Sequence, residues 1–310
     1  MRIAVAGATG CVGSRLVPRL LSAGHTITAL VRDASAPRSA SLVSDPDVQV
    51  IEGDLLTPAG VDECCHNADT AVYLVHSLGS GPNYVDRDRR AATAFARAAS
   101  AADIDRVVYL GGLGDVDGNG DDHLHSRRAV ESVLGADRYD YRLTTVRAGV
   151  VIGANSLSFQ LMRQCAARAP IAPVPPAINT PCQPIAIADV VQYLTTIINN
   201  GTTAEVIEVG APHARPYADL LRVVADALET RFTVHVVPGM PLPAAALGLA
   251  AVTDVSYQTI SPLVESLSTP AVISDPKPAT TLDVEPVSFE TAVDEVLRPT
   301  ETPMTSKAKP

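Results

Sequence analysis

Two side chains of different chemistry stand four residues apart in the stretch His123-Leu-His-Ser-Arg127. Residues at this spacing meet on one face of a helix. A histidine exchanges protons around neutral pH, whereas an arginine stays charged and binds oxygen atoms of a ligand. We therefore expect His123 to serve as a proton donor and Arg127 as a cationic clamp. The alternative is that His123 is an exposed residue at the start of a helix.

A glycine-rich loop provides the second chemical signal. The segment AVAGATGCVG, residues 4–13, follows a strand-like run and leads into a helical pattern. Gly7 permits a tight turn, Gly10 leaves room for a pyrophosphate, and Gly13 lets the helix pack closely on the strand. The amino end of the helix then offers N–H groups to phosphates. This order of elements predicts a dinucleotide cofactor.

The end of the next strand bears on the type of cofactor. An acid there binds an adenosine ribose hydroxyl and favours NAD, whereas an arginine favours the 2′-phosphate of NADP. Arg32 comes first and Asp33 follows, with Arg15 and Arg38 able to contribute. The sequence favours NADP and leaves NAD open. The simpler alternative is that Arg32 is a solvated charge.

A third strand-like run ends in the sequence EGDLL, residues 52–56. Asp54 could accept a hydrogen bond from an adenine amino group, and Leu55 could flank the ring. A solvated loop acid is the alternative for Asp54.

Alternating strands and helices are expected to position these groups. Apolar runs predict strands at 2–6, 26–31, 48–52, 71–75, 106–110 and 144–151, and amphipathic patterns predict helices at 12–23, 84–102, 123–134 and 157–168. The strands are continuous apolar runs, as expected when helices cover both faces of a sheet. The fold class is therefore α/β, with a Rossmann-type doubly wound parallel sheet.

The texture of the sequence changes near residue 170. Six prolines between 170 and 184 predict an irregular loop. We expect residues 1–170 to form an NAD(P)-binding domain and residues 171–298 to complete the sheet and form a small C-terminal substrate lobe. Residues 299–310 are expected to be a disordered tail.

Composition excludes several classes of function. The net charge of -10 disfavours binding to nucleic acid or to an anionic membrane surface. The apolar run at 242–252 is too short to span a bilayer, so a packed helix is expected there. The N-terminus enters a strand pattern at once and leaves no room for a signal peptide. The five cysteines have no metal spacing, which fits a reducing cytoplasm.

Taken together, the segments GATGCVGSRLVPRLLSAGH, LVRD, GDLL, VYLVHSL, VVYLGGLG, LTTVRAGVVIG and NTPCQPIAIADV resemble the atypical branch of the short-chain dehydrogenase/reductase superfamily, in its NmrA-like NAD(P)H-binding family. The resemblance spans roughly residues 1–210. It implies that the cofactor lies across the carboxyl ends of the strands. The implied cofactor residues are Gly7, Thr9, Gly10, Cys11, Val12, Gly13, Arg32, Asp54, Leu55, Val75, His76, Ser77, Leu110, Gly111, Gly112, Arg127, Ala148, Gly149 and Val150.

The resemblance also exposes a departure. The superfamily pattern has Tyr-x-x-x-Lys on the helix after the fifth strand, and His123 and Arg127 stand in those places. The arginine fits the composition, because 21 of the 24 basic residues are arginine. The histidine has no such explanation. The absence of the tyrosine favours hydride acceptors that depend less on protonation by a protein acid, such as quinones and enones.

The leading hypothesis is thus an NAD(P)H-dependent oxidoreductase that transfers hydride to a small-molecule quinone, enone or carbonyl. Phe159 and Gln183 are the expected substrate contacts. The alternatives are a non-catalytic NAD(P) sensor of the NmrA type and an NAD(P)-dependent epimerase. No metal is expected. In this superfamily the helix equivalent to residues 86–99 often packs in a dimer, which makes a homodimer an expectation.

Overall fold

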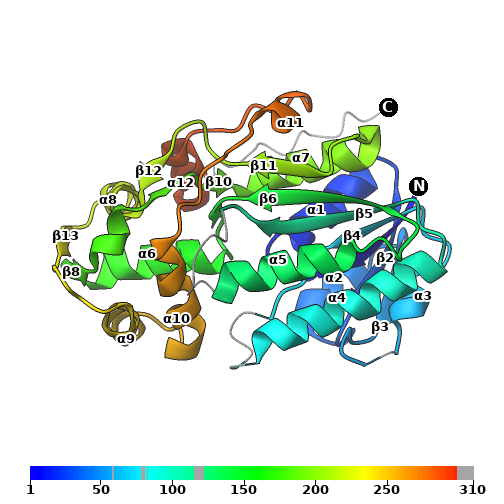
Figure 1. Ribbon diagram of the computed structural model, residues 1–310, viewed down its shortest axis with the longest axis horizontal. Helices are drawn as coiled ribbons and strands as arrows, with labels where there is room; N and C mark the ends of the chain where they lie inside the picture. The colour runs from blue at the N-terminus through cyan, green and yellow to red at the C-terminus, as the bar shows by residue number, and fades with distance from the viewer. Residues whose placement is uncertain (58, 78–80, 82, 115–121, 299–310) are drawn as a thin grey trace, which may run out of the picture.

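A seven-stranded parallel sheet forms the centre of the computed structural model, which describes residues 1–57, 59–77, 81, 83–114 and 122–298 (Figure 1). The strand order is β11-β6-β5-β4-β1-β2-β3, and every neighbouring pair is parallel. The predicted Rossmann-type sheet is confirmed. The expectation for residues 299–310 lies outside the described residues.

The first two thirds of the chain alternate between strand and helix. The elements are β1 (Arg2–Ala6), α1 (Gly13–Ser22), β2 (Thr26–Val31), α2 (Ala40–Val43), β3 (Val48–Glu52), α3 (Val61–Cys65), β4 (Thr70–Tyr73), α4 (Tyr84–Ala101), β5 (Arg106–Gly112), α5 (Asp122–Leu134), β6 (Arg142–Ala148), β7 (Val151–Ile152) and α6 (Leu157–Arg168). A 3-10 turn at Pro37–Ser39 precedes α2.

Helices cover both faces of the sheet (Figure 1). On one face α1 and α7 (Ile187–Asn200) pack on buried Ile3, Val5 and Val72. On the other face α3, α4 and α5 bury Phe95 and Val130. With both faces buried, each strand carries apolar side chains on both sides, which explains its continuous apolar sequence.

Strand β6 ends earlier than the sequence predicts. The expected strand at 144–151 is divided into two strands, β6 and β7. Strand β6 belongs to the main sheet, whereas β7 pairs with β10 (Ile185–Ala186) outside it. At the break a Cβ on Gly149 would lie 1.8 Å from the backbone oxygen of Gln183. The chain therefore turns out of the sheet where only glycine allows the two backbones to approach.

The C-terminal lobe lies beyond the carboxyl ends of the strands (Figure 1). It contains β8 (Ile171–Val174), a 3-10 helix at Pro176–Asn179, β9 (Pro181–Cys182), β12 (Arg215–Pro216), α8 (Tyr217–Ala227), β13 (Thr233–Val236), α9 (Leu242–Val252), α10 (Tyr257–Glu265), η3 (Ser266–Ser268) and α12 (Phe289–Leu297). Helix α11 (Lys277–Thr280) instead packs on the last strand of the main sheet, where Ala279 is part of the core. Strand β11 (Val206–Val209) returns to the main sheet beside β6.

The proline-rich segment is more regular than its composition predicts. Residues 171–174 form β8, which pairs in parallel with β13 although Pro173 lies within it. Because β8 has a neighbour on one side only, the missing N–H of Pro173 costs no hydrogen bond if it faces the open edge. The expectation of an irregular loop from 170 onward was therefore wrong for these four residues.

Within the described part of the chain, no helix is long and apolar enough to cross a membrane.

Candidate functional site

The glycine loop adopts a geometry that side chains would prevent. Gly7 has a positive φ of 95°, and a Cβ on Gly13 would lie 2.2 Å from the backbone oxygen of Gly7. Among the described residues, no acceptor is found for the backbone N–H groups of Cys11, Val12 and Gly13 at the start of α1. Unpaired N–H groups at the amino end of a helix form an anion site.

Of the three glycines in the loop, Gly10 is the one at which a side chain would be least hindered by the protein itself. A Cβ there would approach only the Gly7 oxygen, at 3.2 Å, and Gly10 lines a cavity. The loop thus leaves open the space that a pyrophosphate needs, beside the unpaired N–H groups. The residues present therefore fit the phosphates of a dinucleotide.

Helix α5 places His123 and Arg127 on the wall of the same cavity. The backbone oxygen of Arg127 accepts a hydrogen bond of 3.2 Å from the Tyr109 hydroxyl, which fixes α5 against β5. The Arg127 side chain passes Gly112 at the end of that strand. Arg127 forms no ion pair with any carboxylate among the described residues, so its charge faces the cavity uncompensated by them.

Burial and the positive charge of Arg127 lower the pKa of His123 to about 3. The positive charge of Arg127 is also the main cause that lowers the pKa of His76 well below its ordinary value. Both imidazoles are therefore neutral at physiological pH in the cofactor-free protein. This corrects the expectation that His123 titrates near neutral pH. A neutral imidazole still offers one N–H donor.

A buried carboxylate joins the loop after β4 to α5. Asp88 on α4 accepts a hydrogen bond of 2.7 Å from the backbone N–H of Ser77 and one of 2.9 Å from the Ser126 hydroxyl. Its exposed fraction is 2%. Because Ser126 lies between His123 and Arg127, this bond fixes α5 between the two cavity-facing residues.

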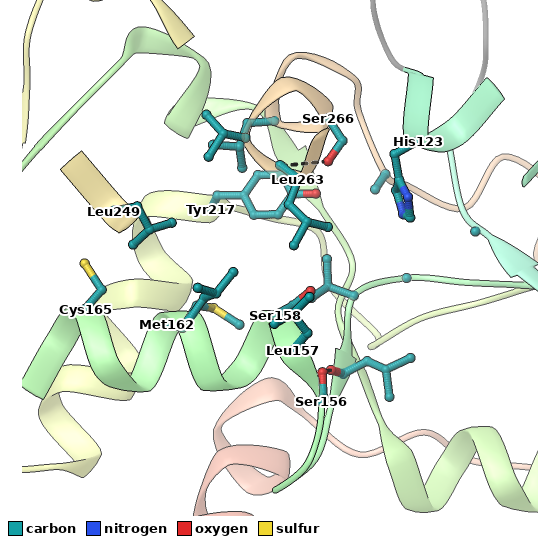
Figure 2. A pocket seen from close by; sticks show the side chains of 18 of the residues that line it. His123, Ser156, Leu157, Ser158, Met162, Cys165, Tyr217, Leu249, Leu263 and Ser266 are labelled. Carbon is teal, nitrogen blue, oxygen red and sulfur yellow. Dashed lines mark hydrogen bonds between the residues drawn. The ribbon is translucent and has the colours of Figure 1, made fainter. Parts of the chain in front are cut away.

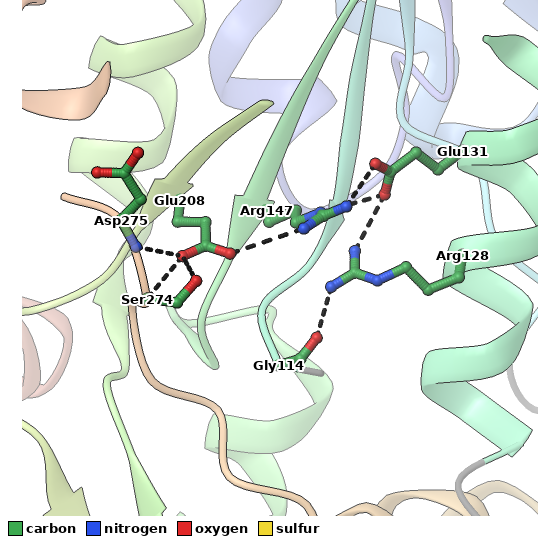
Figure 3. A network of polar contacts seen from close by, with 7 residues as sticks. All are labelled: Gly114, Arg128, Glu131, Arg147, Glu208, Ser274 and Asp275. Atoms are coloured by element: carbon green, nitrogen blue, oxygen red, sulfur yellow. Dashed lines mark hydrogen bonds and ion pairs between the residues drawn. The ribbon is translucent and has the colours of Figure 1, made fainter. Parts of the chain in front are cut away.

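Behind α5 an ion-pair network ties the helix to the sheet and to the C-terminal lobe (Figure 3). Arg147 bonds Glu131 at 2.7 Å and lies 3.7 Å from Glu208. Arg128 pairs with Glu131 at 3.0 Å and donates to the Gly114 oxygen. Two adjacent arginines of α5 thus have different tasks: Arg128 joins this network, and Arg127 faces the cavity.

The network ends on the segment that crosses the strand ends. Glu208 accepts hydrogen bonds from the backbone and hydroxyl of Ser274, at 2.7 and 2.8 Å, and from the backbone of Asp275 (Figure 3). Burial alone raises a carboxyl pKa, but these bonds and Arg147 hold the pKa of Glu208 below its ordinary value. The charged form therefore fastens residues 274–275 beside β11.

The cavity itself has a volume of about 630 Å³ and runs from the glycine loop into the C-terminal lobe. Figure 2 shows the His123 side chain facing the same space as Ser158 and Met162 of α6 and Leu263 of α10. The strand ends at Gly111 and Gly149 form its floor beside the glycine loop. One continuous space therefore joins the predicted cofactor site to the lobe.

Most residues that the sequence assigns to the cofactor lie on this cavity. They are Gly7, Gly10, Cys11, Val12, Gly13, His76, Leu110, Gly111, Gly112, Arg127, Ala148, Gly149 and Val150. The others, Thr9, Arg32, Asp54, Leu55, Val75 and Ser77, lie outside its wall. The cofactor-binding role of both groups stays a prediction.

Arg32 and Asp33 differ in how they are used. Asp33 accepts bonds from the backbone and hydroxyl of Ser35, at 2.9 and 2.6 Å, which lower its pKa. Arg32 is exposed and forms no ion pair with the described residues. At this strand end both bonds within the loop go to one oxygen of the Asp33 carboxylate, Oδ1, and the Arg32 guanidinium is available.

The two predicted substrate contacts lie elsewhere. The amide of Gln183 donates to the Ala211 oxygen at 2.8 Å and accepts from the Ile273 N–H at 2.7 Å, so both of its polar atoms join chain segments. Phe159 is 1% exposed within a core cluster of the lobe. Neither side chain lines the cavity. Both expectations are therefore corrected, because these side chains complete tertiary packing.

The sequence did not predict that residues of the C-terminal lobe would line the cavity. Leu161 and Met162 of α6, Leu249 of α9 and Leu263 of α10 all line it. Their helical apolar spacing is what any packed helix shows. No local signal distinguishes a cavity wall from a core.

Residues 7–149 match the family described as NAD(P)H-binding. This segment is similar to NAD(P)H-binding domains. The parallel sheet has the fold that the resemblance to the atypical short-chain dehydrogenase/reductase group implies.

One curated relative, named ceramide reductase, comes from Caulobacter vibrioides strain NA1000 / CB15N. It is 31% identical over 178 residues, which cover 56% of this chain and 53% of that protein. The chain thus matches about half the length of the relative.

Solved structures extend the likeness to nearly the whole chain. The NADPH-dependent quinone oxidoreductase of Escherichia coli, complexed with NADPH, has a TM-score of 0.75 at 15% identity and covers 96% of this chain and 100% of its own. A nucleoside-diphosphate-sugar epimerase of Staphylococcus aureus has a TM-score of 0.75 at 16% identity, covering 95% and 100%. At these identities the likeness establishes the fold alone.

Proposed function

We propose that this protein is an NAD(P)H-dependent reductase that transfers hydride to the carbonyl group of a small molecule. One observation carries the proposal: His123 and Arg127 face the cavity that also contains the glycine loop and the strand ends. A reduced nicotinamide supplies the hydride when bound and leaves as the oxidised cofactor. The acceptor C=O becomes an alcohol as its carbon gains the hydride and its oxygen gains a proton.

The chain contributes binding, orientation and charge. The unpaired N–H groups of Val12 and Gly13 bind phosphate oxygens. Arg127 stays charged and clamps ribose hydroxyls. His123, neutral because of burial and Arg127, donates an N–H hydrogen bond to the developing alkoxide, while solvent provides the proton. A neutral imidazole can polarise a carbonyl in this way.

NADP is the proposed cofactor. The support is the available Arg32 guanidinium at the end of β2, next to an Asp33 carboxylate that already accepts two bonds on Oδ1 from its own loop. A guanidinium binds a 2′-phosphate with two parallel hydrogen bonds. The names of the relatives, ceramide reductase and NADPH-dependent quinone oxidoreductase, also support a reductase.

The test follows deuterium from NADPH labelled at C4 of the nicotinamide into aldehydes and ketones by mass spectrometry, and follows quinones by the loss of NADPH absorbance, because a hydroquinone exchanges its added hydrogens with water. We expect label on the carbinol carbon of the alcohol product. His123→Ala should lower kcat by about 10²-fold, the scale of one lost transition-state hydrogen bond, and His125→Ala on the exposed side of α5 should not. Tight NADPH binding without transfer to any acceptor would instead identify a nucleotide sensor.

A further inference from the structure

The part of the cavity inside the C-terminal lobe takes no part in the chemistry proposed above. Its wall comes from α6, β8, α8, α9, α10 and η3. The larger side chains on this wall are Leu157, Leu161, Met162, Val174, Leu221, Leu249, Val252, Leu263 and Leu267. Among the described residues that line the cavity, Arg127 is the only lysine, arginine, aspartate or glutamate. It lies at the end of the cavity proposed for the nicotinamide.

Two of the hydroxyls along this wall are bonded to the protein. The Ser156 hydroxyl donates to the Val151 oxygen at 2.6 Å, and the Ser266 hydroxyl donates to the Leu263 oxygen at 2.8 Å (Figure 2). Burial raises the pKa of the Cys165 thiol to about 11, so this group stays neutral. A polar ligand would lose its hydration here and find few partners.

Helix α9 forms the far wall with small residues. Ala244, Ala245 and Gly248 line the cavity, and a Cβ on Gly248 would meet no atom within 4 Å. Ala244 and Gly248 are exposed, so the cavity opens to the surface along this face of α9. The rim is apolar as well, since Ile171 on the cavity wall and Leu247 outside it are each 64% exposed.

We propose that this part of the cavity binds the aliphatic tail of the acceptor, which makes the substrate a carbonyl compound on a single unbranched hydrocarbon chain. The carbonyl end lies beside His123 and Gly111, and the tail runs past Met162 to Gly248. The cavity of about 630 Å³ also serves the nicotinamide end, so the remaining space suits one chain. The carbonyl assignment rests on the proposed function, whereas the tail site rests on the wall of the lobe.

A matched pair of variants on α9 tests the tail site. Gly248→Phe adds a ring on the cavity wall at a position where the Cβ itself meets no atom within 4 Å. Leu247→Phe puts the same ring one position earlier, on an exposed residue outside the wall. Replacing a helix-interior glycine favours the helix, so the first variant is expected to fold.

The readout in turnover is a series of n-alkanals from butanal to dodecanal with NADPH. With the wild type, kcat/KM should rise roughly three- to fourfold for each methylene that enters the cavity. Gly248→Phe should lower kcat/KM for dodecanal at least tenfold while butanal stays within twofold. Leu247→Phe should follow the wild type throughout.

A second readout needs no turnover. cis-Parinaric acid, a fluorescent eighteen-carbon fatty acid, should bind the wild type and Leu247→Phe equally and Gly248→Phe at least tenfold more weakly. That result without reduction of any alkanal would reject the proposed function and keep the tail site. Equal binding to both variants, or reduction of alkanals at a rate independent of length, would overturn the tail site.

Discussion

His123 and Arg127 lie one turn apart on α5, face one cavity, and are electrostatically coupled, since burial and the arginine's charge lower the histidine pKa to about 3. This coupling gives a stability prediction. An unfolded histidine titrates near pH 6.5, so the unfolded state binds the proton first as the pH falls. The contribution of neutral His123 to the free energy of unfolding is complete above about pH 6.5 and is lost as the pH falls toward 3.

His123→Gln removes this titration. Between pH 7 and pH 5 the cofactor-free wild type should therefore lose up to about 2 kcal/mol more unfolding free energy than the variant. Urea unfolding at both pH values measures the difference. Parallel pH dependence of the two proteins would mean that His123 is not desolvated as the structure has it. His125→Gln serves as the control, because His125 is exposed.

Alanine substitutions at two glycines of the same loop should impair the protein for different reasons. Gly10→Ala fills the space beside the unpaired N–H groups, so the protein should fold while NADPH affinity falls at least tenfold. Gly13→Ala puts a Cβ against the Gly7 oxygen, so the thermal midpoint itself should fall. Nucleotide fluorescence titration and thermal unfolding separate the two effects. A Gly10→Ala protein with unchanged affinity would place the phosphates elsewhere.

Arg32 should set the cofactor preference. Arg32→Ala removes the available guanidinium at the end of β2 and should raise the Kd for NADPH about tenfold, the scale of one charged hydrogen bond, with the Kd for NADH unchanged. Arg19→Ala, an exposed arginine in the last turn of α1, is the control for general charge. Equal weakening of both nucleotides would contradict the assignment.

Arg147 should matter for stability more than any surface ion pair. It stands between Glu131 and Glu208, whose side chains are only 15% and 7% exposed. Arg147→Met leaves both carboxylates without this partner and should cost about 3 kcal/mol in urea unfolding. The exposed pair of Arg168 and Asp254 is the comparison, and Arg168→Met should cost less than about 1 kcal/mol. Similar losses for both variants would show that the network is solvated.

The strands and the glycine loop could be read from the sequence because their signals are local. β1, β2 and β3 have the predicted bounds, and α6 begins and ends at the predicted residues. Burial on both sheet faces leaves continuous apolar runs, and the positive φ of Gly7 and the close approach of Gly13 to the Gly7 oxygen both arise within the loop of residues 7–13. The spacing of His123 and Arg127 likewise placed both residues on one helix face.

Other properties depend on segments far apart in the chain. Gln183 sits between Ala211 and Ile273, and Phe159 sits in a core that includes α12, so their surroundings decide that neither reaches the cavity. The pKa of His123 depends on how deeply α5 is buried. The aliphatic wall of the cavity combines α6, α9 and α10, whose apolar residues alone look like any packed helix. The sequence determined which groups could act; tertiary packing decided which of them share a space, because burial, electrostatic environment and free volume are set only when distant segments meet.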